Sequence, residues 1–467
     1  MPCLIAAPCS GSGKTLLSLC LAALARRRGL RLQPFKVVPD YLDPQLLSRV
    51  SGLACRNLDP LLCGEAWVER CFAWHGSRAD LALVEGVMGL FYCRGPSSEG
   101  SSAAVAARLG LPVVLVVEAS RQAGSLAALV RGFRDHGPPR VELAGVVLNR
   151  VGSARQRALL SEALAAIEVP LLGVLPSHPA LELPSRHLGL LPPGEITDLA
   201  GRCETWADLA ESHLELEHLW PLLQPPSCRH GQDPITSLLT PTSRSRSTPV
   251  PLPVAPLPVA VASDAAFHFR YPEAAELLRA SGLEPCPWSP LADEPLPAGC
   301  RGVLLPGGYP ELHAAQLADS QRSLGALRHA AAEGLPIVAE CGGLLLLGQE
   351  LCDGEGRPQP MAGVLPFRAR RGELSLGYRQ ATALADSLLL RRGEQLWGHE
   401  FHRWQLHSEG TTAASLWQLE GWSCPARPEG WSRANVHASW LHLHWAGCPA
   451  IPTRLAGAAA AAKTNKS

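Results

Sequence analysis

Short apolar runs alternate with longer segments of helical period along most of this chain. The runs are rich in valine and leucine and are nearly continuous, which is typical of strands buried on both faces of a parallel sheet. The segments between them predict helices that cover such a sheet. In the first half we expect strands at 3–7, 81–84, 112–117, 143–148 and 171–175, and helices at 16–28, 101–109, 125–134, 155–166 and 196–222.

The same pattern begins again after residue 258, with strands expected at 259–262, 302–305 and 335–339 and helices at 264–271 and 322–333. Between the halves the composition changes to Pro, Ser, Thr and Arg, which predicts a linker that cannot form a packed core. A chain of 467 residues is also too long for one ordinary core. We therefore predict an α/β fold with domains at 1–222 and 259–455, a linker at 223–258 and a tail at 456–467.

The composition of the chain limits the kinds of molecule that it is expected to bind. The chain has 42 basic and 42 acidic residues and no basic stripe, which argues against nucleic acid. Its apolar runs are shorter than the roughly 20 residues that a membrane helix requires. The 15 cysteines have no regular spacing, and Met1 leads directly into an apolar run. These features predict a reduced, cytoplasmic protein that acts on a small molecule.

The segment at 8–15 reads PCSGSGKT and lies between a predicted strand and a predicted helix. Glycines in such a loop let backbone N–H groups surround phosphate oxygens, while Lys14 would reach the outer phosphates and Thr15 would hold Mg²⁺. Pro8 stands where the usual pattern has its first glycine, and an ordinary glycine-rich turn is the simpler alternative. The predicted phosphate-binding residues are Gly11, Ser12, Gly13, Lys14 and Thr15.

Charged residues follow two further strands of this half. Lys36, Asp40 and Asp43 lie at the end of another probable strand, between the helix at 16–28 and the strand at 81–84, and could contact nucleotide, Mg²⁺ or an acidic substrate, or could form a solvated loop. Glu85 ends the next strand, at the edge where parallel sheets bind ligands. A lone acid there is more often a helix cap, but the phosphate loop is its expected neighbour, which favours a role with Mg²⁺.

In the second half, an apolar run ends at Cys341 and is followed by Gly342, another glycine and a leucine-rich segment. This order predicts a strand, a sharp turn and a helix, with the thiol at the helix N-terminus, where the thiolate is favoured. Gly307 and Gly308 follow the preceding strand, and their N–H groups, with that of Gly342, could stabilise an oxyanion. Taken alone, the cysteine would be a small buried residue.

A cysteine nucleophile needs a base, and histidines occur in two later segments, GHEFH at 398–402 and LHLH at 441–444. His442 and His444 alternate along a strand-like run, so both would share one face and either could lie near the cysteine. Two histidines at this spacing also suggest zinc. Cys424 and Cys448 lack the paired spacing of a structural zinc site, which disfavours that interpretation.

Nine segments together resemble the cobyrinic acid a,c-diamide synthase family, the two-domain glutamine amidotransferases of corrin biosynthesis. The resemblance covers nearly the whole chain apart from the linker and the last dozen residues. These segments are PCSGSGKT, KVVPDYLD, EGVMGLF, PSRHLGL, DAAFHFRYPE, LLPGGYPEL, AECGGLLLLG, GHEFH and ASWLHLH.

The resemblance implies an N-terminal, doubly wound P-loop domain like dethiobiotin synthetase and a C-terminal class I glutaminase domain. It implies that Cys341 is the nucleophile and His442 its base, with His444 the second choice. Glutamine would supply ammonia, and ATP with Mg²⁺ near Thr15, Asp40 and Glu85 would activate two carboxylates of cobyrinic acid as acyl phosphates. It also makes a homodimer plausible, and the substrate contacts that it suggests are Lys36, Tyr41, Asp43 and Arg186.

Some positions depart from the family pattern. Val38 replaces the glycine expected before Pro-Asp-Tyr, Tyr92 and Cys93 replace an acid and a glycine, and Glu118 replaces an aspartate. The loss of the acid at Tyr92 bears on how the corrin or its partly amidated intermediate is bound and converted. None of these changes touches the phosphate loop or Cys341.

Two other functions compete with this one. A related amidotransferase could act on hydrogenobyrinic acid or nickel sirohydrochlorin, or could be a cobyric acid synthase. A non-catalytic, nucleotide-dependent regulatory protein is the alternative of another class. The presence of both Cys341 and His442 argues against a regulator, which has no need of a glutaminase.

Overall fold

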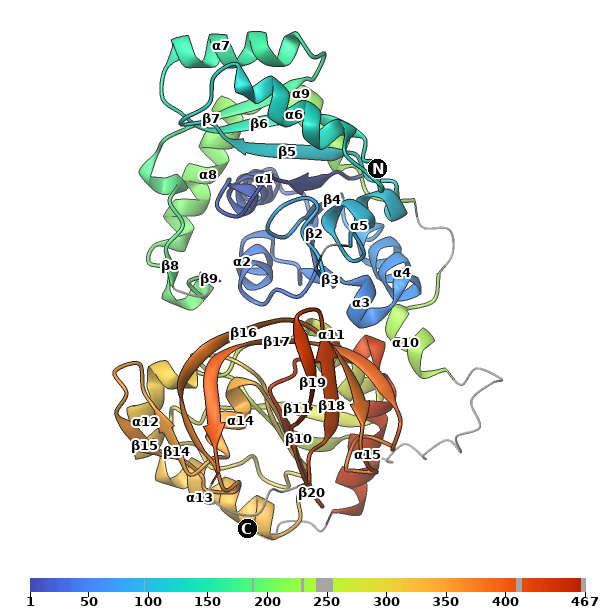
Figure 1. Ribbon diagram of the computed structural model, residues 1–467, viewed down its shortest axis with the longest axis vertical. Helices are drawn as coiled ribbons and strands as arrows, with labels where there is room; N and C mark the ends of the chain where they lie inside the picture. Colours follow the sequence, from blue (N-terminus) through green and yellow to red (C-terminus); the bar gives the residue numbers. More distant parts are fainter. Residues whose placement is uncertain (96, 187–188, 228–230, 241–254, 409–413, 463–467) are drawn as a thin grey trace. The chain divides into compact units, whose positions relative to one another are not determined.

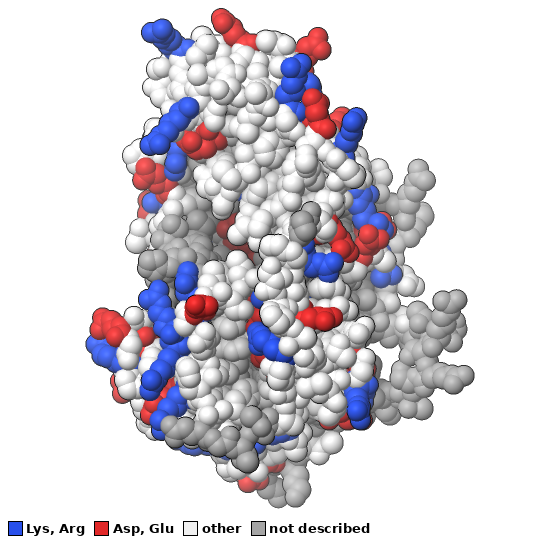
Figure 2. All heavy atoms as spheres, in the orientation of Figure 1, with Lys and Arg blue, Asp and Glu red and all other residues white. Residues whose placement is uncertain are grey.

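The computed structural model describes the whole chain except residues 96, 187–188, 228–230, 241–254, 409–413 and 463–467 (Figure 1). The chain divides into two compact units, Met1–Pro234 and Ile235–Ser467. Among the described residues, no helix is both long and apolar enough to cross a membrane. On the face shown in Figure 2, Lys and Arg side chains are interspersed with Asp and Glu.

The first unit is built on a seven-stranded sheet with the order β3-β2-β4-β1-β5-β6-β7, and all its strand pairs are parallel. The strands are β1 (Leu4–Ala6), β2 (Leu32–Val37), β3 (Arg56–Leu58), β4 (Leu81–Glu85), β5 (Val113–Glu118), β6 (Leu143–Val151) and β7 (Leu171–Pro176). The principal helices are α1 (Lys14–Arg27), α2 (Leu42–Ser51), α4 (Glu65–Gly76), α5 (Ser102–Leu109), α6 (Ser125–Asp135), α7 (Ala154–Ala165) and α8 (Leu199–His213).

Strand β1 lies between β4 and β5, near the centre of this sheet. Ile5 of β1 is in register with Glu85, the last residue of β4. Because the strands are parallel, the loop after β1 and the end of β4 meet at the same edge of the sheet. The predicted phosphate loop and the predicted acid are thereby brought together.

The single helix expected at 196–222 is wrong, because the structure has α8, then α9 (Leu216–Leu219) and a 3₁₀ turn at Trp220–Leu223. The break has a clear cause. Leu214 forms an antiparallel bridge with Gly173 of β7, and the N–H of Glu215 donates to the carbonyl of Leu172 at 2.9 Å. The chain thus adds to the edge of the sheet at this point, which a helical conformation does not allow.

The second unit contains a six-stranded sheet with the order β11-β10-β12-β13-β21-β20, in which only the β20–β21 pair is antiparallel. Its strands are β10 (Leu257–Ala262), β11 (Leu283–Trp288), β12 (Val303–Leu305), β13 (Ile337–Glu340), β20 (Trp431–Arg433) and β21 (Val436–Ser439). The helices of this unit are α10 (Pro234–Leu239), α11 (Pro272–Ala280), α12 (Ala314–Asp319), α13 (Gln321–Ala332), α14 (Gly342–Leu346) and α15 (Ala450–Ala461).

A second sheet of this unit was not expected from the sequence. It contains β14 (Glu350–Cys352), β15 (Pro358–Pro360), β16 (Arg368–Ala383), β17 (Gln395–His407), β18 (Trp417–Gly421) and β19 (Cys424–Glu429). Strands β16 and β17 are long, curved and antiparallel (Figure 1), with a register shift between Arg371 and Ser375. Because these two strands contain many polar residues, the sequence shows no apolar run that would predict them.

Two expectations about the start of this unit are corrected. No helix opens at 264–271, since Asp264 accepts hydrogen bonds from the N–H groups of Ala266 and Phe267 in a tight turn, and α11 begins at Pro272. The segment expected to be an irregular linker contains α10. Its most proline-rich part, 241–254, lies outside the described residues.

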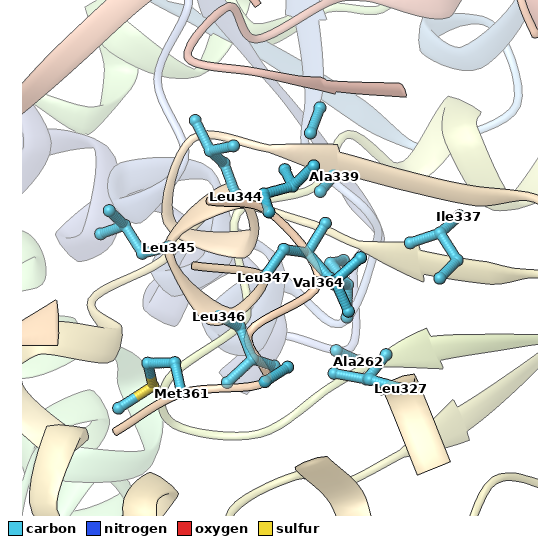
Figure 3. Close-up of a cluster of buried hydrophobic side chains, with 14 of the residues drawn as sticks. Ala262, Leu327, Ile337, Ala339, Leu344, Leu345, Leu346, Leu347, Met361 and Val364 are labelled. Atoms are coloured by element: carbon cyan, nitrogen blue, oxygen red, sulfur yellow. The ribbon is translucent and has the colours of Figure 1, made fainter. Parts of the chain in front are cut away.

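Helix α14 is short, and its apolar side chains are buried in the core of the second unit. The neighbouring strand β13 and the segment around Val364 close this core (Figure 3). Burial on all sides holds the turn that precedes α14 in one position. The labelled core residues are Ala262, Leu327, Ile337, Ala339, Leu344, Leu345, Leu346, Leu347, Met361 and Val364.

Candidate active sites

The phosphate loop joins β1 to α1, and two of its glycines have the left-handed backbone that such a loop requires, with φ of 80° at Gly11 and 110° at Gly13. A Cβ atom on Gly13 would lie 2.4 Å from Nδ2 of Asn149. The same Nδ2 donates to the carbonyl of Ser12 at 3.0 Å. Asn149, near the end of β6, therefore holds the phosphate loop in place through contacts with Ser12 and Gly13. The sequence had shown only that a polar residue ends this strand.

Lys14 begins α1, and its Nζ donates to the carbonyl of Met88 at 2.6 Å. Burial, and then the charge of Lys36, lower the pKa of Lys14 to about 8. An anion at the loop would stabilise the charged form, so the lysine fits a phosphate group. Thr15 donates its hydroxyl proton to Glu85 at 2.8 Å.

Lys36 is the centre of the charges at this edge and is 1% exposed. Its Nζ lies 2.6 Å from Oδ2 of Asp43, 2.6 Å from Oε1 of Glu85 and 3.5 Å from Oδ2 of Asp40. Asp40 and Glu85, two of the predicted Mg²⁺ ligands, therefore lie around one ammonium group, and the third, Thr15, donates its hydroxyl proton to Glu85. The structure also brings Asp43 into this set, with its Oδ2 at 3.2 Å from the hydroxyl of Thr15.

The pKa values of this cluster follow from burial and from the neighbouring charges. Burial alone would lower the pKa of Lys36, but Asp43, Glu85 and Asp40 outweigh it and raise the pKa well above its ordinary value. Burial and the neighbouring Asp43 raise the pKa of Asp40 to about 7. Although burial opposes it, the charge of Lys36 lowers the pKa of Asp43.

One acceptor of the cluster fits a metal ion. Oε2 of Glu85 is buried and accepts no hydrogen bond from the part of the chain that the structure describes. An acceptor left over beside the Thr15 hydroxyl is an oxygen ligand of the kind that Mg²⁺ prefers. Among the residues with described side chains, no group of three or more His, Cys, Asp or Glu is arranged to hold a metal ion by itself.

The two other predicted substrate contacts, Tyr41 and Arg186, lie in different segments of the first unit. Tyr41 is buried and precedes α2. Arg186 belongs to the short strand β8 (Ser185–Arg186), which pairs with β9 (Gly189–Leu190), and its side chain lies outside the described atoms.

The glutaminase candidate is centred on Cys341, which connects β13 to α14 with φ of 48° and ψ of −112°. A non-glycine residue with positive φ is strained, and such strain persists only where the surroundings enforce it. Here the N–H of Cys341 donates to the carbonyl of Ser439 at 2.7 Å, which continues the β13–β21 pairing. The predicted elbow is present, and its side chain is 5% exposed.

The predicted oxyanion glycines pack directly against this elbow. A Cβ atom on Gly342 would lie 2.8 Å from the carbonyl oxygen and 2.9 Å from the nitrogen of Gly308, so only glycine allows this approach. A Cβ atom on Gly307 would lie 2.4 Å from Cε1 of His442. The structure therefore brings Gly307, Gly308, Gly342 and His442 to one place beside Cys341.

The structure also separates the two candidate histidines, which do not share a strand face. His442 lies beyond the end of β21, where it bridges His399 of β17 and its ring meets Gly307. In His444, Nδ1 accepts from the N–H of Ala446 at 3.3 Å and Nε2 lies 3.5 Å from Oε2 of Glu273. Both ring nitrogens of His444 are thus engaged away from Gly307, which favours His442 as the base.

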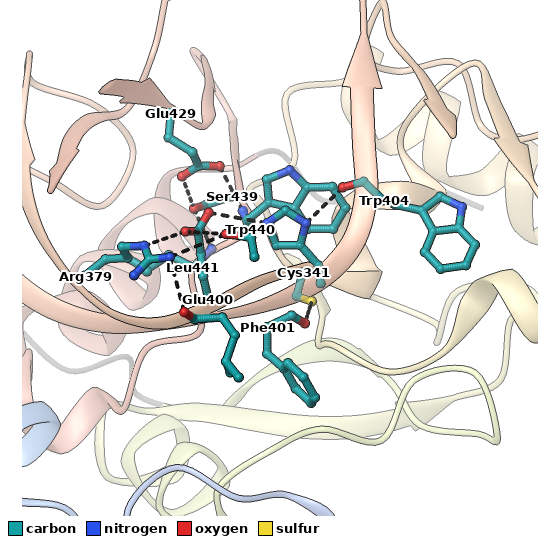
Figure 4. A network of polar contacts seen from close by, with 12 residues as sticks. Cys341, Arg379, Glu400, Phe401, Trp404, Glu429, Ser439, Trp440 and Leu441 are labelled. Carbon is teal, nitrogen blue, oxygen red and sulfur yellow. Dashed lines mark hydrogen bonds and ion pairs between the residues drawn. The ribbon is translucent and has the colours of Figure 1, made fainter. Parts of the chain in front are cut away.

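Burial of Cys341 opposes the expectation that the helix N-terminus favours a thiolate. Burial raises the pKa of Cys341 well above its usual range, and Glu311 raises it further. Helix α14 has only five residues and offers little to offset this. The thiol instead donates to the carbonyl of Phe401 at 3.6 Å (Figure 4). Burial lowers the pKa of His442 to about 3, so both partners are neutral.

The GHEFH segment, which contains two of the candidate histidines, forms part of β17 and supports the site. Glu400 is fully buried, accepts from Nε of Arg379 at 2.7 Å and also pairs with Arg427 and His402 (Figure 4). Burial opposes ionisation, but these three partners lower the pKa of Glu400 well below its usual range. The ring of His402 stacks on Trp440 at 3.9 Å. This network anchors the strand whose Phe401 carbonyl contacts the thiol.

Comparisons with known proteins identify both halves of the chain. Residues 3–191 match the CobQ/CobB/MinD/ParA nucleotide binding domain, and residues 258–449 match the CobB/CobQ-like glutamine amidotransferase domain. Together the two models account for most of the chain.

Relatives match over the full length. A Synechococcus protein named cobyrinate a,c-diamide synthase is 42% identical over 96% of both chains. One of the same name from Gloeobacter violaceus is 43% identical over 95% of this chain and 94% of its own. A Streptomyces coelicolor protein named hydrogenobyrinate a,c-diamide synthase is 42% identical over 96% of both chains. The chain therefore belongs to the cobyrinate and hydrogenobyrinate a,c-diamide synthase family of glutamine amidotransferases.

Proposed function

We propose that this enzyme converts the a- and c-carboxylates of cobyrinic acid to amides, with glutamine as nitrogen donor and ATP as the source of activation. The observation that carries the proposal is the coexistence of two assembled sites in one chain. A phosphate loop with Thr15 against Glu85 occupies the first unit, and a cysteine elbow with His442 against Gly307 occupies the second. Full-length relatives with the corresponding name support the choice of substrate.

In the glutaminase site, Sγ of Cys341 attacks the carboxamide carbon of glutamine and His442 takes the thiol proton. The N–H groups of Gly308 and Gly342 are our candidates for holding the oxyanion. The C–N bond then breaks, and His442 returns the proton to the leaving nitrogen, so that ammonia departs from a glutamyl thioester. Water hydrolyses the thioester with His442 again as base, which releases glutamate and restores the thiol.

In the synthetase site, a carboxylate oxygen of the corrin attacks the γ-phosphorus of ATP and ADP leaves. Phosphorylation is necessary because a carboxylate is a poor electrophile. Ammonia then attacks the acyl phosphate and phosphate departs. Lys14 and the loop N–H groups hold the phosphates. Thr15, Asp40 and Glu85 would hold Mg²⁺, which neutralises phosphate charge when bound.

The four proposed substrate contacts fall into two groups with different roles. Lys36 and Asp43 are occupied with each other and with Glu85, which favours a role in ordering the nucleotide end of the site over direct contact with a large macrocycle. Tyr41 and Arg186 remain our candidates for contacts with the corrin. An arginine there would pair with one of its many carboxylates.

A second candidate substrate is hydrogenobyrinic acid, which lacks the metal. It is favoured by a relative with that name at the same identity as the cobyrinate enzymes. The two rings differ at their centre and carry the same peripheral carboxylates, so the sites described above suit either.

One experiment decides between them. The protein is incubated with ATP, Mg²⁺ and glutamine, and with either cobyrinic or hydrogenobyrinic acid, and the products are examined by mass spectrometry. We expect two hydroxyl groups to be replaced by two amino groups on the preferred ring. Absence of amides on both rings would contradict the proposal, and faster conversion of the metal-free ring would select the second candidate.

A further inference from the structure

Glu311 lies next to the nucleophile, although nothing in the catalytic steps uses it. It belongs to the 3₁₀ turn Pro310–His313, which follows directly on the Gly307–Gly308 turn. The turn packs against the elbow, since Cδ of Pro310 lies 2.9 Å from where a Cβ atom on Gly342 would be. Glu311 is therefore fixed to the same rigid part of the site as the proposed oxyanion donors.

The carboxylate of Glu311 is buried, with 8% of the residue exposed. It forms no hydrogen bond or ion pair with the side chain of any other described residue, and burial raises its pKa to about 7. Two other buried acids of this unit have side-chain partners: Glu400 pairs with two arginines, and Glu429 accepts from the Trp417 indole and the Ser439 hydroxyl, each at 2.6 Å. A buried carboxylate without a cation is costly unless a ligand supplies one.

The position of this charge relative to the thiol limits the ligand. Glu311 belongs to the turn that packs against Gly342, the residue after Cys341, and its charge adds to the burial that raises the pKa of Cys341. A molecule whose reacting end lies at Cys341 can therefore place a cation at Glu311. Glutamine has one cationic group, the α-ammonium, which is roughly 5 Å from its carboxamide carbon in the extended chain.

We propose that Glu311 binds the α-ammonium group of glutamine while Cys341 attacks the carboxamide. The inference rests on the proposed role of Cys341 and adds a specificity residue to that site. An ammonium–carboxylate contact in a dry pocket is a strong, charge-assisted hydrogen bond. It rejects amides that lack the ammonium group, because they leave the buried carboxylate unpaired. Bound glutamine also compensates the negative charge that disfavours the thiolate.

The test compares two substrates in the glutaminase reaction. Glutaramate has the carboxamide and the carboxylate of glutamine but lacks the amino group. We expect the wild type to prefer glutamine over glutaramate by roughly 100-fold or more in kcat/KM. In Glu311→Gln we expect the KM for glutamine to rise roughly 10- to 100-fold and the preference to be largely lost. Amidation driven by added ammonia should be unchanged in this variant.

Two further variants keep the test decisive. Glu311→Asp retains the charge and should keep most of the preference, even if Glu311→Gln folds poorly. Glu355→Gln removes a carboxylate that is 73% exposed and should change nothing. A wild type that hydrolyses both substrates equally well would overturn the proposal, and so would a Glu311→Gln variant that keeps the full preference. These outcomes differ from failure of the proposed function, in which Cys341→Ala would leave glutamine hydrolysis intact or no corrin would be amidated.

Discussion

The two units use charge in opposite ways. In the first, Asp40, Asp43 and Glu85 lie around the ammonium group of Lys36 beside the phosphate loop. In the second, burial keeps the nucleophile and its base neutral, and Glu400 pairs with basic side chains such as that of Arg379. Both sites lie at the end of parallel strands, so the fold alone does not explain the difference.

The chemistry explains it. Transfer of a phosphoryl group requires opposing charges that are already in position, because the substrate arrives with several negative charges. Attack by a thiol on a neutral amide requires a proton transfer that occurs only when substrate is present, so a neutral pair in a dry pocket is sufficient at rest. Removal of one group should therefore have different consequences in the two units.

The largest effect is expected from Cys341→Ala. Glutamine-driven amidation should fall by about 10⁴-fold or more because the covalent route is lost, while ammonia-driven amidation continues in the first unit. Product formation with each nitrogen source measures both. The converse variant, Lys14→Ala, should lose amidation from both sources, and Cys286→Ala serves as the matched cysteine control. Loss of the ammonia-driven reaction in Cys341→Ala would show that the thiol supports structure instead.

Next in size is Lys36→Met, which leaves three acids without their cation. We expect amidation to fall roughly 100-fold or more and the free energy of unfolding of the first unit to fall by about 3–5 kcal/mol, as for other broken buried ion pairs. Thermal unfolding with and without Mg²⁺ tests this, since an added cation should stabilise the variant more than the wild type. Arg49→Met removes an exposed positive charge from α2 and is the control. Unchanged stability would contradict the assigned network.

A smaller effect, measured here as stability, is expected from Glu400→Gln. The free energy of unfolding of the second unit should fall by about 3 kcal/mol at pH 7, because Arg379 loses its buried partner. The folded-state pKa of Glu400 lies below its unfolded value, so its contribution is present above roughly pH 4.3 and is lost as the pH falls further. Denaturant titrations at pH 7 and in acid should show the difference from wild type shrinking. Glu420→Gln, at an exposed position, is the control.

The smallest effect is expected from Asn149→Ala, which removes the amide that supports Ser12. The KM for ATP should rise by roughly 5- to 10-fold, the value of one hydrogen bond, with glutaminase activity unchanged. Asn435→Ala is the matched variant in the second unit, where Nδ2 bonds to the carbonyls of Ala331 and Leu335. It should alter stability without altering the KM for ATP. Equal effects on the KM in both variants would contradict the separation of the two sites.

Local sequence patterns were sufficient to predict the main strands and the two functional turns of this protein. Alternating apolar runs predicted the parallel strands, PCSGSGKT predicted the phosphate loop, and the glycine after Cys341 predicted the elbow. Each of these depends on neighbours within a few residues, where periodicity and backbone conformation are determined. The long strands β16 and β17 were missed because their residues are largely polar, so that no apolar run marks them.

Only the tertiary structure decided which side chains contact one another and which of them carry a charge. The assignment of His442 depends on its contact with Gly307, more than 100 residues away in the chain, and that of His444 depends on Glu273. The neutrality of Cys341 depends on burial, which no local pattern encodes, and so does the raised pKa of Glu311, which pairs with no described basic side chain. The sequence by itself determined which groups are present and on which kind of turn. Their ionisation and pairing were decided by desolvation and by long-range contacts, because both come into existence only when the chain has folded.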